Sequence, residues 1–371
     1  MSRFCGTIAQ CRSAARKRRI LMKCKKCKYS LLVVALALIL VGSILASLFN
    51  TGFGSVSAER IHFDGGHGTL SGILYMPKDA SPENPKPTVI VTHGYLNSAE
   101  MQDANAIELS RRGFVVLALD QYDHGHSALD AQYYADTSFF GVWLPFWQHS
   151  MHDAVQYMYE QPYVLKDENG NGMIGVTGHS NGALACREAV LQDAEGLIAA
   201  ALLVSNDAVY YDEEGNFYNQ FGSRDAAIIA CQYDEFFHRV DGNPPREYMN
   251  QVTAQSFLHF GEDPTGLDVR EQHLFYERDG MIRAIFNPPI THPWAHFSAD
   301  CVAFGAEFFD LALDAPKDLA HTDQIWQWKA AFNALGIAGF FLIEEVPAKT
   351  AGNENYLRNL TYGFRQIKAQ L

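Results

Sequence analysis

Short, uniformly apolar runs alternate with segments of helical spacing over most of the chain. Strands that are apolar along their whole length are buried on both faces, which is typical of a parallel sheet with helices on either side. The pattern therefore predicts an α/β fold with a mostly parallel central sheet. We expect strands at residues 88–92, 114–119, 173–177, 199–204, 226–231 and 282–286, and helices at residues 100–112, 151–159, 183–189 and 298–313.

Two segments depart from this alternation. Residues 61–63 and 70–76 read as strands around the glycine-rich turn at 64–68, so an antiparallel hairpin should open the domain. Residues 235–281 contain paired prolines, scattered aromatic side chains and many charges. They predict an insertion that roofs the active site or, equally well, a lengthened surface helix and loop.

An uncharged apolar run at residues 31–49 is close to the ~20 residues that cross a bilayer as a helix. Residues 1–30 hold ten Lys and Arg and no Asp or Glu, which favours a cytoplasmic N-terminus. Val56-Ser57-Ala58 resembles a signal-peptidase site, but the run exceeds the usual ~7–15-residue signal core. We therefore expect a retained single-pass anchor, with the rest of the chain extracytoplasmic and a cleaved signal as the alternative.

Charge and composition divide the chain further. After residue 30, 19 basic residues stand against 42 acidic ones, which argues against nucleic acid as a partner. The sequence indicates no oligomeric state. The expected parts are a basic cytoplasmic tail (1–29), a transmembrane anchor (30–49), a linker (50–58), an α/β domain (59–313, with 235–281 as a candidate cap) and a C-terminal tail (314–371).

The C-terminal tail has its own membrane-like features. Trp326 and Trp328 precede an uncharged stretch at residues 330–343, which is short of a full span. Paired tryptophans are typical of a membrane interface. We expect an interfacial or truncated second membrane segment, the alternative being a C-terminal helix docked on the domain.

Ser180 is the candidate nucleophile around which the chemistry is organised. It lies in Gly178-His179-Ser180-Asn181-Gly182, between an expected strand and an expected helix. A nucleophile elbow requires this context, because the turn is too tight for side chains larger than glycine on either side of the serine. A serine hydroxyl also needs a base, a carboxylate that orients the base, and N–H donors for the oxyanion.

The motifs around this serine resemble those of the α/β-hydrolase family over about residues 59–313. A strand runs into His93-Gly94 upstream of the elbow, and residues 120–127 are similar to the family's Asp-x-x-Gly-x-Gly-x-Ser loop. The resemblance implies an oxyanion hole formed by the N–H groups of Tyr95 and Asn181. The esterase and dienelactone-hydrolase-like branches are the most similar, because of the Gly-His-Ser-Asn-Gly elbow and the Gly-x-Leu-Tyr-x-Pro hairpin.

The acid and the base are placed by the chain order of that family, Ser, then Asp or Glu, then His. Asp234 follows the strand at 226–231 and is preferred over its neighbour Glu235 and over Asp207. His292 follows the last strand and is the expected base. His296 is the alternate, although it almost touches Ser298, the expected cap of the last helix.

The sequence thus predicts a membrane-anchored serine hydrolase that cleaves a small-molecule ester by acyl transfer to water. We expect no metal and no organic cofactor. One alternative is a serine peptidase on the same fold, which we rank lower because no propeller-length domain precedes the hydrolase region to filter peptides. A non-catalytic binding protein is the other, and the complete Ser, Asp, His set argues against it.

Overall fold

The computed structural model describes residues 30–133, 139–208, 210–239 and 242–348, with the side chains of 139–146 and 344–348 outside the description. The chain forms two compact units. One is the α/β domain, residues 50–326, and the other contains the two terminal helices, within residues 1–49 and 327–371.

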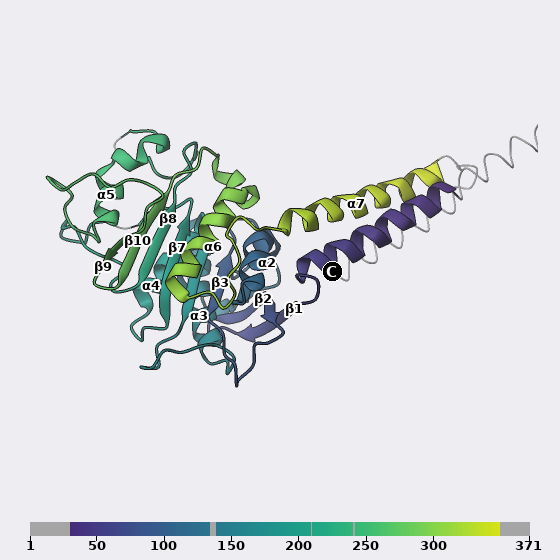
Figure 1. The fold of residues 1–371 in the computed structure, drawn as a ribbon, viewed down its shortest axis with the longest axis horizontal. Coiled ribbons are helices and arrows are strands. Elements are labelled where there is room, and N and C mark those ends of the chain that lie inside the picture. The colour runs from purple at the N-terminus through teal and green to yellow at the C-terminus, as the bar shows by residue number, and fades with distance from the viewer. Residues whose placement is uncertain (1–29, 134–138, 209, 240–241, 349–371) are drawn as a thin grey trace, which may run out of the picture. The chain divides into compact units, whose positions relative to one another are not determined.

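A ten-stranded sheet forms the centre of the α/β domain (Figure 1). Its order is β1-β2-β4-β3-β6-β7-β8-β10-β9, with the short β5 paired to β2. The strands from β4 to β10 in this order are parallel, whereas β1, β2 and β9 pair antiparallel with their neighbours. The bounds are β1 Val56–Asp64, β2 Gly68–Pro77, β3 Thr88–Thr92, β4 Val115–Asp120, β5 Ala128–Leu129, β6 Ile174–His179, β7 Ile198–Val204, β8 Asp225–Ile229, β9 Tyr276–Arg278 and β10 Met281–Phe286.

Helices cover both faces of this sheet, so the predicted mostly parallel α/β architecture is confirmed. Helices α3 and α4 pack together over one face, and α2 and α6 pack together over the other. Strands β3, β4 and β6 are buried along their whole length because each face lies under helices. The bounds are η1 Ala99–Gln102, α2 Asp103–Arg111, η2 Ala131–Tyr133, α3 Phe139–Tyr159, α4 Asn181–Gln192, η3 Pro245–Asn250, α5 Val252–Leu258, η4 His292–Phe297 and α6 Ala299–Leu313.

The observed elements differ from the expected ones mainly at their ends. Strand β1 begins at Val56, inside the segment expected as a linker, because its backbone pairs with β2 from Val56↔Pro77 onward. Helix α3 begins at Phe139, well before residue 151. Within 235–281, β9 pairs with β10 and α5 packs against β10, so part of this insertion extends the sheet.

The second unit holds two helices, Ser30–Asn50 and α7 (Trp326–Ala348). Among the residues that the structure describes, the Ser30–Asn50 helix alone is long and apolar enough by composition to cross a membrane. Its side chains are mostly exposed within the protein, unlike those of a core helix. Length and composition of this kind fit either a membrane anchor or a signal sequence.

Candidate active site

Ser180 lies in a strained turn between β6 and α4. Its backbone angles are φ 59° and ψ −118°, a region that residues with a side chain rarely adopt. Hydrogen bonds to the Ser180 backbone hold this conformation. The Ser180 N–H donates to the Val204 carbonyl at 2.9 Å, and the Ser180 carbonyl accepts from Ala183 N–H at 2.9 Å and from Asn206 Nδ2 at 3.1 Å. The turn is therefore fixed from β7 as well as from its own helix.

The two glycines that flank the serine are required by close backbone packing. A methyl group at Gly178 would overlap the carbonyl of Gly182, and one at Gly182 would lie 2.5 Å from the His93 carbonyl oxygen. At Gly94, a methyl group would lie 3.1 Å from the Cβ of Ser180. The end of β3 thus passes directly beside the elbow, as a nucleophile elbow requires.

The predicted acid and base lie in direct contact. The Nδ1–H group of His292 donates to Oδ2 of Asp234 at 2.8 Å, and the Asp234 side chain is fully buried. Burial alone would raise the pKa of this carboxyl. The hydrogen bonds from His292 and from the backbone N–H groups of Phe236 and Phe237 outweigh burial and lower the pKa below its ordinary value. Asp234 is therefore held as a carboxylate.

The imidazole of His292 is fixed by further contacts. Its backbone N–H donates to Glu235 Oε2 at 3.0 Å, and its carbonyl accepts from His179 Nε2 at 2.9 Å. The rings of Phe236 and Phe237 pack on it, with centroid distances of 5.0 and 5.6 Å. The ring therefore has one orientation, which leaves Nε2 as the nitrogen free of the carboxylate.

His296, the alternate base, has different surroundings. Its ring packs against His179 with centroids 4.1 Å apart and lines a small cavity of about 20 Å³ beneath the elbow. Burial, with His292 and His93 nearby, lowers the pKa of His296 to about 4. No carboxylate in the described part of the chain is paired with it, so it lacks the orienting partner that His292 has.

Asp207, one of the two other acids considered, belongs to a separate network. It accepts a short hydrogen bond from the Tyr248 hydroxyl, which itself lies 2.6 Å from the Tyr210 hydroxyl. Burial raises the Asp207 pKa to about 7, against the lowering effect of Tyr248. Because Asn206 contacts the Ser180 carbonyl, this network lies next to the elbow, and it ties η3 of the insertion to the end of β7.

The expected oxyanion donors lie on either side of Ser180. Asn181 is the first residue of α4, where backbone N–H groups lack partners within the helix and the helix dipole favours negative charge. Tyr95 follows Gly94 at the end of β3, with an exposed side chain. The N–H of the next residue, Leu96, donates to His124 Nε2 at 3.3 Å. The β3 loop is thus tied to the loop after β4.

The loop at residues 120–127 is held by its buried aspartate. Asp120 accepts from Ala99 N–H at 2.7 Å, from Arg60 at 2.7 Å and from His126 N–H at 3.1 Å. His93, buried beneath this loop, accepts from Gln121 N–H at 3.1 Å, and burial lowers its pKa to about 4. His93 therefore serves packing and a loop hydrogen bond.

Sequence reasoning overlooked two residues that support the candidate site. Glu235 was weighed only as a rival acid, yet it holds the His292 backbone, and Asn206 holds the Ser180 carbonyl. Both interactions join segments that are far apart in sequence. The one available signal was position, since each residue follows closely on a strand that ends at the catalytic edge of the sheet.

Comparison with known proteins agrees with this architecture. Residues 83–240, from just before β3 to beyond β8, match the family described as serine aminopeptidase, S33. No curated protein matches the sequence. The family match, the strand order and the elbow together support the α/β-hydrolase superfamily.

Similar solved structures include three hydrolases. A dienelactone hydrolase-like promiscuous phosphotriesterase from metagenomic libraries is 16% identical, with 76% of this chain and 99% of that chain covered and a TM-score of 0.44. A bacterial heroin esterase is 16% identical (75% and 89% covered, TM-score 0.44). A hyperthermophilic esterase from the archaeon Pyrobaculum calidifontis is 14% identical (78% and 91% covered, TM-score 0.43).

Proposed function

We propose that this α/β-hydrolase cleaves a small-molecule carboxylic ester by acyl transfer to water. Ser180 Oγ attacks the ester carbonyl while His292 Nε2 takes the hydroxyl proton. His292 returns this proton to the alcohol that leaves, which gives an acyl-enzyme. Water then attacks the acyl-enzyme with His292 again as base, and this step releases the carboxylic acid and restores Ser180.

The observation that carries this proposal is the His292–Asp234 hydrogen bond of 2.8 Å beside the strained Ser180 turn. A carboxylate on Nδ1 fixes the tautomer in which Nε2 can accept a proton, and it stabilises the imidazolium that forms. Tyr95 and Asn181 would donate their N–H groups to the oxyanion, in keeping with their positions beside the elbow.

Turnover of a short-chain nitrophenyl ester tests this role. Ser180→Ala should lower kcat by about 10⁴-fold or more while the thermal unfolding curve stays close to wild type, because the substitution removes a single hydroxyl group and keeps the Cβ. Ser57→Ala, on an exposed position of β1, is the matched control and should keep full activity. Equal turnover by wild type and Ser180→Ala would overturn the proposal.

A serine peptidase is the second candidate, and the description of the matched family favours it. Both reactions use the same acyl-enzyme, so the leaving group must distinguish them. Turnover of an aminoacyl nitroanilide in preference to the matched nitrophenyl ester would support the peptidase. A folded protein that turns over neither, and whose serine does not react with a covalent probe, would instead be a binding protein.

We further propose that the hydrolase domain lies outside the cytoplasm, held by the Ser30–Asn50 helix. The Lys and Arg residues within 1–30 favour a cytoplasmic position for the N-terminal segment, and the helix is long enough to span a bilayer. Glu83 lies on an exposed loop before β3. A cysteine placed there should react with a membrane-impermeant maleimide on intact cells, and protection until the cells are opened would contradict this location.

A further inference from the structure

We propose that α7 is a second membrane-spanning helix, packed antiparallel on the Ser30–Asn50 helix, so that both ends of the chain lie on the same side of the membrane. This goes beyond the single pass and the interfacial or truncated second segment expected from the sequence. The proposal rests on the Ser30–Asn50 helix being a retained anchor.

Close contacts between the two helices run along most of their length. A methyl group at Gly42 would lie 2.7 Å from the Phe332 carbonyl oxygen and 2.8 Å from Gly336 N, and one at Gly339 would lie 2.7 Å from the Ala35 carbonyl oxygen. The two backbones therefore touch where glycine leaves room. Small residues at such contacts are typical of helix pairs inside membranes.

Aromatic contacts continue the pairing toward the hydrolase domain. Phe49 stacks on Phe332 with centroids 5.5 Å apart and lies 6.2 Å from the ring of Trp328. From Gly339 to Trp328 the residue numbers fall on α7, while those of the contacted partners rise from Ala35 to Phe49. The helices are therefore antiparallel, and if one crosses a bilayer then the other crosses it in the opposite direction.

The length and surface of α7 suit this placement. All 23 residues of α7 make about 35 Å of helix, compared with the ~30 Å hydrocarbon core of a bilayer, but its uncharged part makes only about 21 Å, so composition alone does not mark it as a span. Residues 330–343 carry no charge, and tryptophans mark the end at Trp326 and Trp328. Ile337 and Phe341 are more than half exposed on the pair, as are Val33 and Leu40 of the other helix. Acyl chains of lipid are the partner that would cover such an apolar surface.

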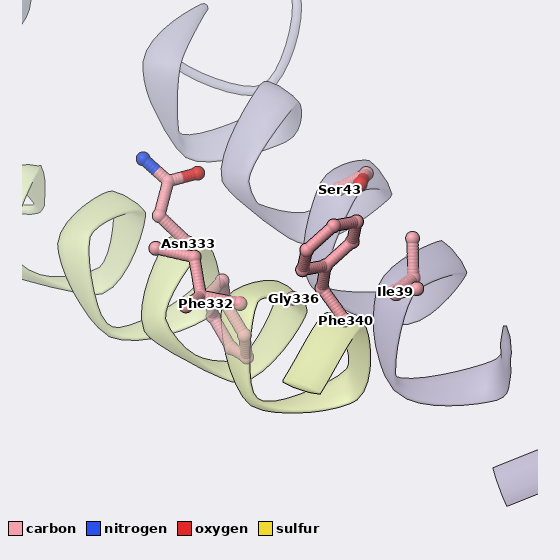
Figure 2. A pocket seen from close by; sticks show the side chains of 7 residues that line it. Ile39, Ser43, Phe332, Asn333, Gly336 and Phe340 are labelled. Atoms are coloured by element: carbon pink, nitrogen blue, oxygen red, sulfur yellow. The ribbon is translucent and has the colours of Figure 1, made fainter. Parts of the chain in front are cut away.

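A cavity between the helices shows the same apolar character. It has a volume of about 470 Å³, and Figure 2 shows Ile39 and Phe340 beside each other on its wall, one from each helix. Ser43 and Asn333 add polar groups to this wall. Polar side chains between apolar helices stabilise association in a membrane, where water does not compete for them.

Both chain junctions are fixed by hydrogen bonds within the hydrolase domain. The Tyr75 hydroxyl lies 3.1 Å from both Asn50 Oδ1 and Asp103 Oδ1. The buried Glu108 carboxylate accepts from Trp326 N–H at 3.0 Å. Asp103 and Glu108 both belong to α2, about 7.5 Å apart along its axis.

The charge of the last residues agrees with the proposed topology. Residues 349–371 carry one acidic residue against four basic ones, Lys349, Arg358, Arg365 and Lys368. Short segments next to a span that are rich in Lys and Arg stay in the cytoplasm. Both ends of the chain would then lie on that side, with the hydrolase domain on the other.

Cysteine accessibility in the full chain tests the second span. The four cysteines before the anchor are replaced by serine, and Cys186, Cys231 and Cys301 are buried. Single variants Glu83→Cys and Gln370→Cys are then treated with impermeant maleimide before and after the cells are opened. The proposal predicts that the two positions label from opposite sides, and labelling from the same side overturns it. Labelling of position 83 from the cytoplasm alone contradicts the domain location instead.

Cross-linking in membranes tests the helix pairing, with Ile39→Cys and Phe340→Cys joined by a short thiol cross-linker. Gly339→Ala should lower the intramolecular yield several-fold, because its methyl group meets the Ala35 backbone. Gly336→Ala is the matched control, since a methyl group there meets nothing within 4 Å. Absence of the cross-link, or equal loss with both substitutions, would overturn the pairing.

Discussion

His292 Nδ1 lies 2.8 Å from Asp234 Oδ2, although the two residues are 58 positions apart in sequence. Asp234 follows β8, and His292 opens η4 after β10, the next strand of the sheet. Adjacent parallel strands end at one edge, which brings the residues just beyond them together. The pair therefore depends on the register of β8 with β10, and Glu235 and the phenyl rings of residues 236 and 237 complete its surroundings.

Because only His292 is paired with Asp234, substitution of each candidate base in turn should show which one acts. His292→Ala should lower kcat for ester turnover by about 10⁴-fold or more, because Ser180 loses its proton acceptor. His296→Ala should cost no more than about tenfold, since no carboxylate in the described part of the chain orients it. Steady-state kinetics of both variants on one nitrophenyl ester makes the comparison. The reverse order of effects would assign the base to His296.

The lowered pKa of Asp234 predicts how stability depends on pH. The folded protein holds this carboxyl with a pKa below that of the unfolded chain, so the pair stabilises the fold above about pH 4 and loses its effect as pH falls further. Asp234→Asn should be less stable than wild type at neutral pH, and the difference should shrink below about pH 4. Urea denaturation across this range measures it, and a constant difference would contradict the assignment.

Glu235 should act as a positioning residue for His292. Glu235→Ala removes the acceptor of the His292 backbone N–H while Asp234 stays in place. We expect kcat to fall by about three- to tenfold with little change in KM, because the imidazole is less well oriented and the substrate contacts are kept. Glu235→Gln, whose side-chain oxygen can still accept, should recover most of the activity. Equal losses in both variants would point to charge rather than to positioning.

The packing of the elbow predicts opposite effects for two glycine substitutions. Gly178→Ala should destabilise the fold by about 2 kcal/mol or more, since the methyl group overlaps the backbone of Gly182. Gly305→Ala, inside α6, meets Leu202 only at 3.4 Å and should stabilise the helix by about 0.5–1 kcal/mol. Thermal unfolding of both variants checks the pair. Similar stability in the two would show that the elbow is less tightly packed than described.

The sequence predicted the central sheet well because its strands are buried on both faces. Residues 88–92 form β3 as expected, and the last helix begins after Ser298, whose hydroxyl accepts from Cys301 N–H. The expected hairpin is present, although its strands are longer than the apolar pattern indicated. Backbone hydrogen bonds between the two strands continue beyond their apolar residues, so the apolar pattern could not predict where the strands end.

Other features depended on contacts between distant segments, which leave no periodic pattern. The Tyr248–Asp207 hydrogen bond joins residues 41 positions apart, and the Asn206–Ser180 contact joins residues 26 apart. The sequence also placed Asp234 and His292 as partners, but by the chain order of a resembling family rather than by spacing. The pairing of α7 with the first helix is of the same kind, because glycines show where backbones touch only once the partner is known.

The most direct test of the central claim is labelling of the purified protein with a fluorophosphonate, which reacts only with an activated serine hydroxyl. Wild type is compared with Ser180→Ala, His292→Ala and His296→Ala at equal concentration. The proposal predicts strong labelling of wild type and His296→Ala, none of Ser180→Ala, and a rate lowered by about 10³-fold or more for His292→Ala. Absence of labelling in folded wild-type protein, or labelling that persists in Ser180→Ala, would contradict it.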